Sequence, residues 1–220
     1  MRERAGRGCR GIVRCRRRRP CSRKACGSSR IFLFEKLLLK HRRFDGGWSE
    51  PLSREILHIP RAVCVLPYDP ASDSVVLIEQ FRTGALTHEG GPWMIECVAG
   101  LMEEGEETAE TARREVREEA GLEVQELVRI GVYAPSPGAV TERTTMYIAR
   151  VDASVAGGVH GLAEEHEDIR VHVVGFDRAI ELVDAERITC ANAQLCLRWL
   201  QLHIERIRAE WLGTEVSESS

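Results

Sequence analysis

Short apolar segments alternate with turn-rich segments between residues 31 and 176. The apolar segments are rich in β-branched residues and are bounded by glycine, proline and aspartate, a pattern typical of strands. The predicted strands are IFLFEKLLLKHRRF, REILHI, RAVCVLPY, SVVLIEQFR, WMIECVAGL, ELVRIGVYA, TTMYIARV and IRVHVVGF. The first two flank the turn signal DGG at residues 45–47 and are expected to form an N-terminal hairpin or small sheet.

One helix interrupts these strands. Ala109, Ala112, Val116 and Ala120 follow one another at spacings of three and four residues, which predicts a narrow buried stripe along a helix. Gly121 is expected to end this helix, because glycine adopts the left-handed conformation found at helix C-termini.

Two further helices are predicted after residue 176, in DRAIELVDAERI and in CANAQLCLRWLQLHIERIRAEWL. Leu195, Trp199 and Leu202 are expected on one face of the longer one. Strands interrupted by one central helix and closed by helices predict an α/β or α+β sandwich, with a small β region at the N-terminus.

Charge divides the 220-residue chain into two parts. Residues 1–30 hold 12 Lys or Arg against one acid, a charge of +11. Because the net charge of the whole chain is -3, the remaining residues carry a charge of -14. We expect a disordered basic head over 1–30, N-terminal strands over 31–60, a catalytic domain over 61–213 and a polar tail over 214–220. The acidic body argues against nucleic-acid binding except through the head.

No apolar run reaches the roughly 20 residues that span a bilayer, so no membrane association is expected. The cysteines outside the head lie in apolar segments, as expected for buried, reduced thiols of a cytoplasmic protein: Cys64, Cys97, Cys190 and Cys196. The head contains four more cysteines but no CxxC pair, so a zinc site there is weakly supported.

Carboxylates crowd one side of the central helix. Glu115, Glu118 and Glu119 are spaced by three and four residues and can converge at one edge of the alanine stripe. Mg²⁺ prefers such oxygen ligands and shares them with substrate phosphates. The alternative is a solvated acidic helix face.

The stretch GLMEEGEETAETARREVREEAGL resembles the Nudix box, GX5EX7REUXEEXGU with U aliphatic. The matching positions are Gly100, Glu106, Arg114, Glu115, Val116, Glu118, Glu119, Gly121 and Leu122. The resemblance implies an α/β/α sandwich with a mixed sheet and a hydrolase that uses Mg²⁺, with Mn²⁺ as a substitute. It implies metal ligands at Glu115, Glu118, Glu119 and the carbonyl of Ala99. It also implies that an ion pair between Glu106 and Arg114 braces the loop.

Residues 31–212 resemble the bacterial ADP-ribose pyrophosphatases in VVLIEQFR, SPG and GLAEEHEDIRVHVV, and Pro137 lies sixteen residues beyond Gly121 as in that subfamily. This resemblance implies hydrolysis of ADP-ribose to AMP and ribose 5-phosphate by a homodimer. The implied substrate-binding residues are Arg82 at the phosphates, Arg54 and Glu55 from the partner subunit at the adenine, Glu142 near the terminal ribose, and Pro137.

In the same subfamily the acidic loop closes over the substrate. This loop is AEEHED, residues 163–168. By its register the resemblance implies that Glu165 is the general base that activates water, and Glu165 and Glu118 are the expected catalytic residues. Glu167 is expected as a further metal ligand. Two alternatives stay open. One is a related pyrophosphatase of GDP-mannose or ADP-glucose. The other is a non-catalytic Nudix-like sensor whose basic head binds nucleic acid.

Overall fold

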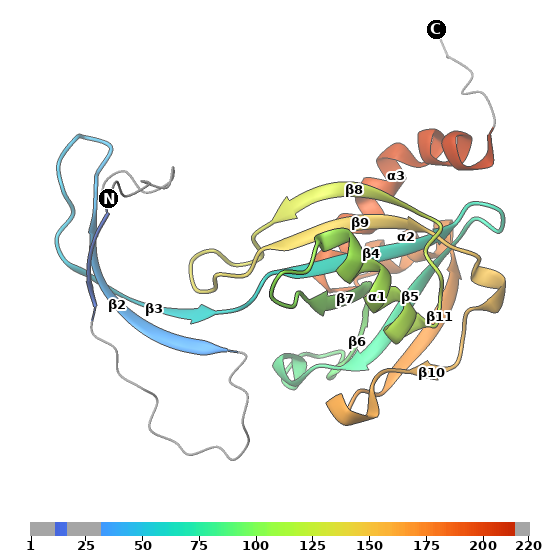
Figure 1. The fold of residues 1–220 in the computed structure, drawn as a ribbon, viewed down its shortest axis with the longest axis horizontal. Helices are drawn as coiled ribbons and strands as arrows, with labels where there is room; N and C mark the ends of the chain where they lie inside the picture. The colour runs from blue at the N-terminus through green and yellow to red at the C-terminus, as the bar shows by residue number, and fades with distance from the viewer. Residues whose placement is uncertain (1–11, 17–31, 214–220) are drawn as a thin grey trace, which may run out of the picture. The chain divides into compact units, whose positions relative to one another are not determined.

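The computed structural model describes residues 12–16 and 32–213, which belong to two compact units (Figure 1). The N-terminal unit runs to Pro60 and also includes Ser136–Glu142. The second unit comprises Arg61–Pro135 and the chain from Arg143 onward. The short segment Ser136–Glu142 therefore leaves the second unit and returns to it.

Three antiparallel strands form the N-terminal unit, in the order β1 (Ile12–Arg16), β2 (Leu33–His41) and β3 (Leu52–His58). The predicted hairpin across residues 45–47 is confirmed as β2 and β3. Strand β1 lies inside the segment that was expected to be disordered, so that expectation is wrong for these five residues. Backbone pairing with β2 orders them despite their weak hydrophobic pattern. The rest of the head, and the polar tail, lie outside the described residues.

A mixed eight-stranded sheet is the centre of the second unit. Its order is β10-β11-β5-β4-β9-β8, with β6 paired to β5 and β7 paired to β4. Only the pairing of β4 with β9 is parallel among these described strands. The strands are β4 (Ala62–Asp69), β5 (Ser74–Phe81), β6 (Trp93–Glu96), β7 (Val98–Leu101), β8 (Glu126–Tyr133), β9 (Thr144–Arg150), β10 (Val159–His160) and β11 (Ile169–Gly175).

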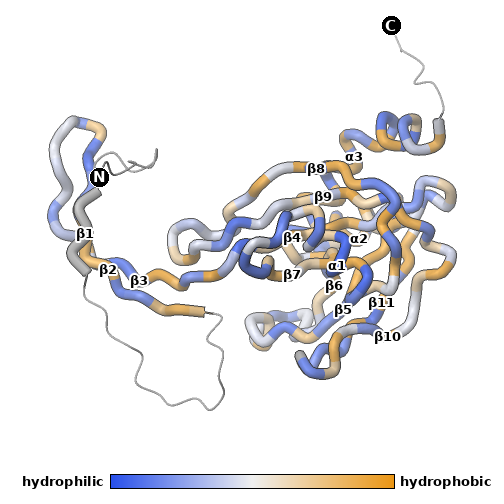
Figure 2. The backbone as a smooth tube through the Cα atoms, in the orientation of Figure 1, coloured by the Kyte–Doolittle hydropathy of each residue, from blue (hydrophilic) through white to orange (hydrophobic). Residues whose placement is uncertain are grey.

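Helices cover both faces of this sheet, which confirms the predicted α/β/α sandwich (Figure 1). Helix α1 (Thr108–Ala120) packs on one face, and α2 (Phe176–Asp184) and α3 (Ala191–Leu212) pack on the other. Successive residues of a strand point to opposite faces. In β4, therefore, Leu66 joins the α2 and α3 layer while Val65 joins the α1 layer. Figure 2 shows the apolar positions that follow from this two-sided burial.

The predicted stripe of α1 is confirmed from its second turn onward. Ala112, Val116 and Ala120 are fully buried. Ala109 lies one residue after the helix start and is exposed, so its predicted burial is wrong. Gly121 ends the helix in the left-handed conformation, with φ of 67°.

The face of α3 that carries Leu195, Trp199 and Leu202 is not the face that packs on the sheet. Leu202 is 81% exposed and Leu195 is 41% exposed, whereas the sheet covers Ala193, Cys196, Leu197, Leu200 and Ile207. This helix carries apolar residues around much of its circumference, so the sequence contains two competing stripes. Packing against the sheet selects one of them. No helix among residues 12–16 and 32–213 is long and apolar enough to cross a membrane.

Helix α3 provides a matched pair of leucines for a stability test. Leu200→Ala is expected to lower the free energy of unfolding by about 2–5 kcal/mol, because it opens a cavity in a closed core. The control Leu202→Ala removes the same atoms from an exposed position and should change stability by no more than about 0.5 kcal/mol. Urea denaturation followed by circular dichroism measures both. Equal losses would contradict the assigned helix face.

Candidate active site

Helix α1 holds the three glutamates against strand β7. Glu115 and Glu119 are buried, at 8% and 3% exposure, and Glu118 is partly exposed beside them. One carboxylate oxygen of Glu119 accepts a hydrogen bond of 3.0 Å from the backbone N–H of Ala99. The helix therefore places these side chains at the seam between itself and the sheet, as their spacing predicts.

Gly100 is required by the close approach of Glu115. A Cβ atom at this position of β7 would lie 1.9 Å from the carboxylate carbon of Glu115, which is far inside contact distance. The first glycine of the motif therefore leaves room for a carboxylate. The loop that follows turns at Gly105, where φ is 87°.

Arg114 connects the loop to the helix. Its Nε lies 3.0 Å from Oε1 of Glu106, which confirms the predicted brace. Its Nη1 also lies 2.8 Å from Glu115 and 2.9 Å from Glu118. One guanidinium thus holds two of the glutamates and offsets part of the repulsion between them.

The carboxylates differ in how easily they lose their protons. Burial is the main reason why the pKa of Glu119 is raised to about 8 and that of Glu115 to about 7, and the negative charge of Glu167 contributes to both shifts. In contrast, hydrogen bonds from Arg114 lower the pKa of Glu106 to about 2. Glu106 is therefore a permanently charged brace, whereas the buried pair needs additional positive charge to ionise fully near neutral pH.

These residues fit a divalent cation. The donors are hard carboxylate oxygens, partly buried and grouped on one helix, which is the ligand chemistry that Mg²⁺ and Mn²⁺ use. A bound dication also supplies the positive charge that Glu115 and Glu119 need. Among the described residues, no three of these carboxylates have oxygens within 4.8 Å of one another. A single ion would therefore bind only some of them without side-chain movement.

Arg82 lies on the same side of the sheet, just after β5. Its Nε and Nη2 are both 2.7 Å from Oε2 of Glu96, and the amide of Gln80 lies 3.3 Å from the same oxygen. The charge of Arg82 lowers the pKa of Glu119, which places the guanidinium near the carboxylate cluster. Glu96, which anchors Arg82, was not among the residues predicted from the sequence. The only signal was an acid at the end of the apolar run WMIE.

The acidic loop also reaches this cluster. It contains the 3-10 helix η3 (Ala163–Glu165), and His166 follows in the left-handed conformation with φ of 58°. Glu167 accepts a hydrogen bond of 3.0 Å from the N–H of Leu162, and its charge acts on Glu115 and Glu119. Glu165 is the last residue of η3, and its side chain lies outside the described part of the molecule.

The other predicted substrate-binding residues belong to the N-terminal unit. Arg54 and Glu55 lie on β3, while Pro137 and Glu142 lie in the segment Ser136–Glu142. Within that unit the N–H of Leu57 donates to the carbonyl of Ala139 at 2.8 Å. The two groups of predicted residues, far apart in sequence, thus share one small unit.

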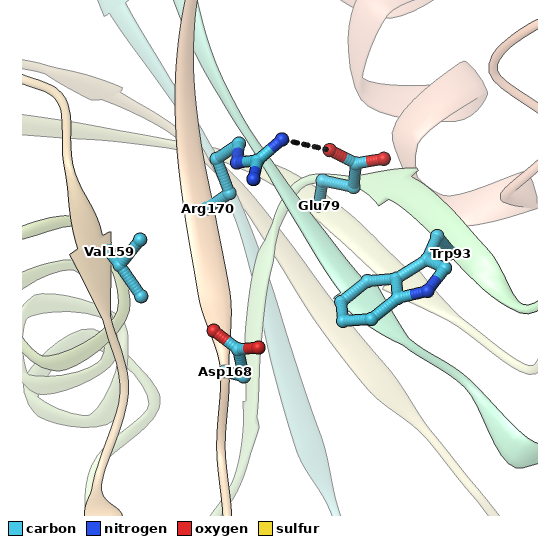
Figure 3. A pocket seen from close by; sticks show the side chains of 5 residues that line it. All are labelled: Glu79, Trp93, Val159, Asp168 and Arg170. Atoms are coloured by element: carbon cyan, nitrogen blue, oxygen red, sulfur yellow. Dashed lines mark ion pairs between the residues drawn. The ribbon is translucent and has the colours of Figure 1, made fainter.

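A cavity of about 300 Å³ is lined by residues of β5, β6, β10 and β11 and by Asp168 (Figure 3). Arg170 and Glu79 face one another across it at 4.0 Å, and Trp93 and Asp168 complete its polar and aromatic lining. It contains none of the residues predicted from the sequence. Asp168 directly follows Glu167, so the acidic loop borders both this cavity and the glutamate cluster.

Comparison with known proteins agrees with this fold. A family model described as the NUDIX domain matches residues 58–190. An ADP-ribose pyrophosphatase of Escherichia coli (strain K12) is 43% identical over 181 residues, covering 82% of this chain and 87% of the relative. A GDP-mannose pyrophosphatase of Shigella flexneri is 34% identical over 155 residues, covering 68% and 78%. A crystal structure of an ADP compounds hydrolase superposes with a TM-score of 0.58 at 18% identity, covering 89% of this chain and 97% of that one.

The structure is an α/β/α sandwich in which a carboxylate-bearing helix packs on a mixed sheet, and its carboxylates suit a divalent cation. Together with the family model and the relatives, it shows that the chain belongs to the NUDIX domain family. Members of this family generally need a divalent metal ion, and the glutamates of α1 provide suitable ligands.

The contact between Gly100 and Glu115 generates a test. Gly100→Ala is expected to displace the Glu115 carboxylate and to weaken Mn²⁺ binding by about tenfold or more, since ligand orientation contributes that much to metal affinity. The control Gly90→Ala places its new methyl group in open space. Electron paramagnetic resonance of free Mn²⁺ measures both affinities. Unchanged Mn²⁺ binding in Gly100→Ala would contradict the assigned role of Glu115.

Proposed function

We propose that this protein hydrolyses the pyrophosphate bond of ADP-ribose, giving AMP and ribose 5-phosphate. The observation that carries the proposal is the intact carboxylate cluster of α1 in a chain that is 43% identical to an ADP-ribose pyrophosphatase over 82% of its length. A non-catalytic sensor would not need to retain Glu115, Glu118 and Glu119 together with the Arg114 brace. A catalytic function therefore explains the site better than a sensor function does.

We propose Mg²⁺ as the metal, with Mn²⁺ as a substitute. Glu115, Glu118 and Glu119 would hold it, together with Glu167 and the carbonyl of Ala99. When bound, a divalent ion offsets the charge of the diphosphate and lowers the pKa of a coordinated water. The high pKa values of the two buried glutamates imply that the site releases protons as it takes up the metal.

The remaining groups of this chain position the substrate and move the proton. Arg82 presents its guanidinium to the diphosphate, and Glu96 holds that guanidinium in one orientation through two contacts of 2.7 Å. Glu165 accepts the proton of the attacking water. Glu118 is the second proposed catalytic residue. A base on a loop meets its water only after substrate has bound, which limits wasteful reaction.

The N-terminal unit is proposed to bind the rest of the substrate. Arg54 and Glu55 would contact the adenine, Glu142 the terminal ribose, and Pro137 the same region. We further propose that the protein is a homodimer in which Arg54 and Glu55 serve the partner's site. The shared membership of all four residues in one small unit supports a common task. Analytical ultracentrifugation measures the oligomeric state.

A second candidate is hydrolysis of another sugar nucleotide, because the chain is also 34% identical to a GDP-mannose pyrophosphatase. We expect the specificity constant kcat/KM for ADP-ribose to exceed those for GDP-mannose and ADP-glucose by about tenfold or more, as the substrate-binding groups would be left unpaired by the wrong ligand. Release of AMP, GMP or sugar phosphate with Mg²⁺ measures all three. A higher kcat/KM for GDP-mannose would select the second candidate.

The metal-site assignment is tested on α1 itself. Glu119→Gln keeps the shape of the buried side chain but removes its charge, and should lower kcat about a hundredfold or more while the circular dichroism spectrum is unchanged. The matched control Glu110→Gln makes the same change on an exposed face of α1 and should keep wild-type turnover. Near-normal turnover in Glu119→Gln would exclude this glutamate as a metal ligand.

A further inference from the structure

Three cysteines that are distant in sequence meet in the core of the second unit. Cys64 lies on β4, Cys97 between β6 and β7, and Cys196 in α3. They are 0%, 1% and 0% exposed, and their Sγ atoms all lie within 4.8 Å of one another. The expected burial of these thiols is confirmed. Their convergence was invisible in the sequence, where they appear scattered.

The spacing of these sulfurs matches a thiolate-bound ion. A Zn–S bond is about 2.3 Å, so an ion in the plane of three thiolates separates them by about 4.0 Å. The observed limit of 4.8 Å requires only a small contraction. We propose that Cys64, Cys97 and Cys196 form a buried three-thiolate site for a soft, thiophilic metal ion of the Zn²⁺ and Cd²⁺ class.

The surroundings of the cluster distinguish it from a random group of core residues. Three different elements, β4, the link between β6 and β7, and α3, bring the three sulfurs together at one place that is closed off from solvent. The thiolate is the form of cysteine that binds a metal. Cys190 is partly buried nearby, but it does not belong to the group of sulfurs that lie within 4.8 Å of one another. Three cysteines, and not four, make the proposed ligand set.

The proposed site differs from the glutamate cluster in place and in chemistry. The three cysteines belong to the apolar layer between the sheet and helices α2 and α3, whereas α1 packs on the opposite face. Sulfur ligands select soft ions, and carboxylates select Mg²⁺. The two sites should therefore load independently. Because the thiols are closed off from solvent, entry requires a local opening of α3 and should be slow.

The experiment uses Cd²⁺ as the probe and the full chain. The head cysteines could also bind Cd²⁺, so the background protein carries Cys9→Ser, Cys15→Ser, Cys21→Ser and Cys26→Ser. An excess of Mg²⁺ occupies the carboxylates. We expect one Cd²⁺ per chain after long incubation, an ultraviolet thiolate-to-metal charge-transfer band, and a rise in Tm of several degrees as the ion stabilises the folded state.

Variants assign the ligands. In the background protein, Cys64→Ala and Cys196→Ala should each abolish the charge-transfer band and the rise in Tm. The matched control Cys190→Ser alters the neighbouring thiol and should keep both. Glu119→Gln should also keep both, so that loss of hydrolysis and loss of Cd²⁺ binding are separate results.

Two outcomes would overturn the proposal. One is the absence of a charge-transfer band in the background protein at equilibrium. The other is a band that persists in both Cys64→Ala and Cys196→Ala. If either alanine variant fails to fold by circular dichroism, native mass spectrometry of the background protein decides, because it needs no change in the cluster. One tightly held Cd²⁺ per chain, accompanied by the thiolate-to-metal charge-transfer band of the same sample, supports the site, and its absence rejects it.

Discussion

The active site depends on keeping two buried carboxylates charged beside a strand. Glu115 and Glu119 are held between α1 and β7, where burial raises their pKa values to about 7 and 8. Three features stabilise this arrangement. The N–H of Ala99 donates to Glu119, the guanidinium of Arg114 pairs with Glu115, and the absence of a side chain at Gly100 leaves space for the Glu115 carboxylate. A divalent cation completes it, because paired positive charge stabilises carboxylates in a medium of low dielectric constant.

Arg114 both braces the loop and positions glutamates of α1. Its guanidinium joins Glu106 of the loop to Glu115 and Glu118 of the helix. The low pKa of Glu106 and the high pKa of Glu115 follow from the same neighbour acting against different degrees of burial. Two glutamates only nine residues apart therefore differ in their state: Glu106 is a charged brace, whereas Glu115 is a buried carboxylate that we propose as a metal ligand.

The mixed sheet separates two kinds of chemistry. Oxygen ligands lie on the α1 side, and thiols lie on the side of α2 and α3. The alternation of side chains along β4 and along the segment from β6 to β7 produces this separation. Glu96 and Cys97 illustrate it: the first anchors Arg82 beside the glutamates, and the second belongs to the cysteine cluster.

The sequence by itself determined most of the strands, the limits of α1, and the residues of the glutamate cluster, since these rest on local periodicity and on a motif contained within 23 residues. It did not show that the run WMIECVAGL is divided into β6 and β7, which pair with different strands. Only the tertiary structure decided which stripe of α3 is buried, that Glu96 orients Arg82, and that Cys64, Cys97 and Cys196 meet. Each of these depends on contacts between elements far apart in the chain. Residue spacing within one element carries no information on such contacts until the sheet has brought the elements together.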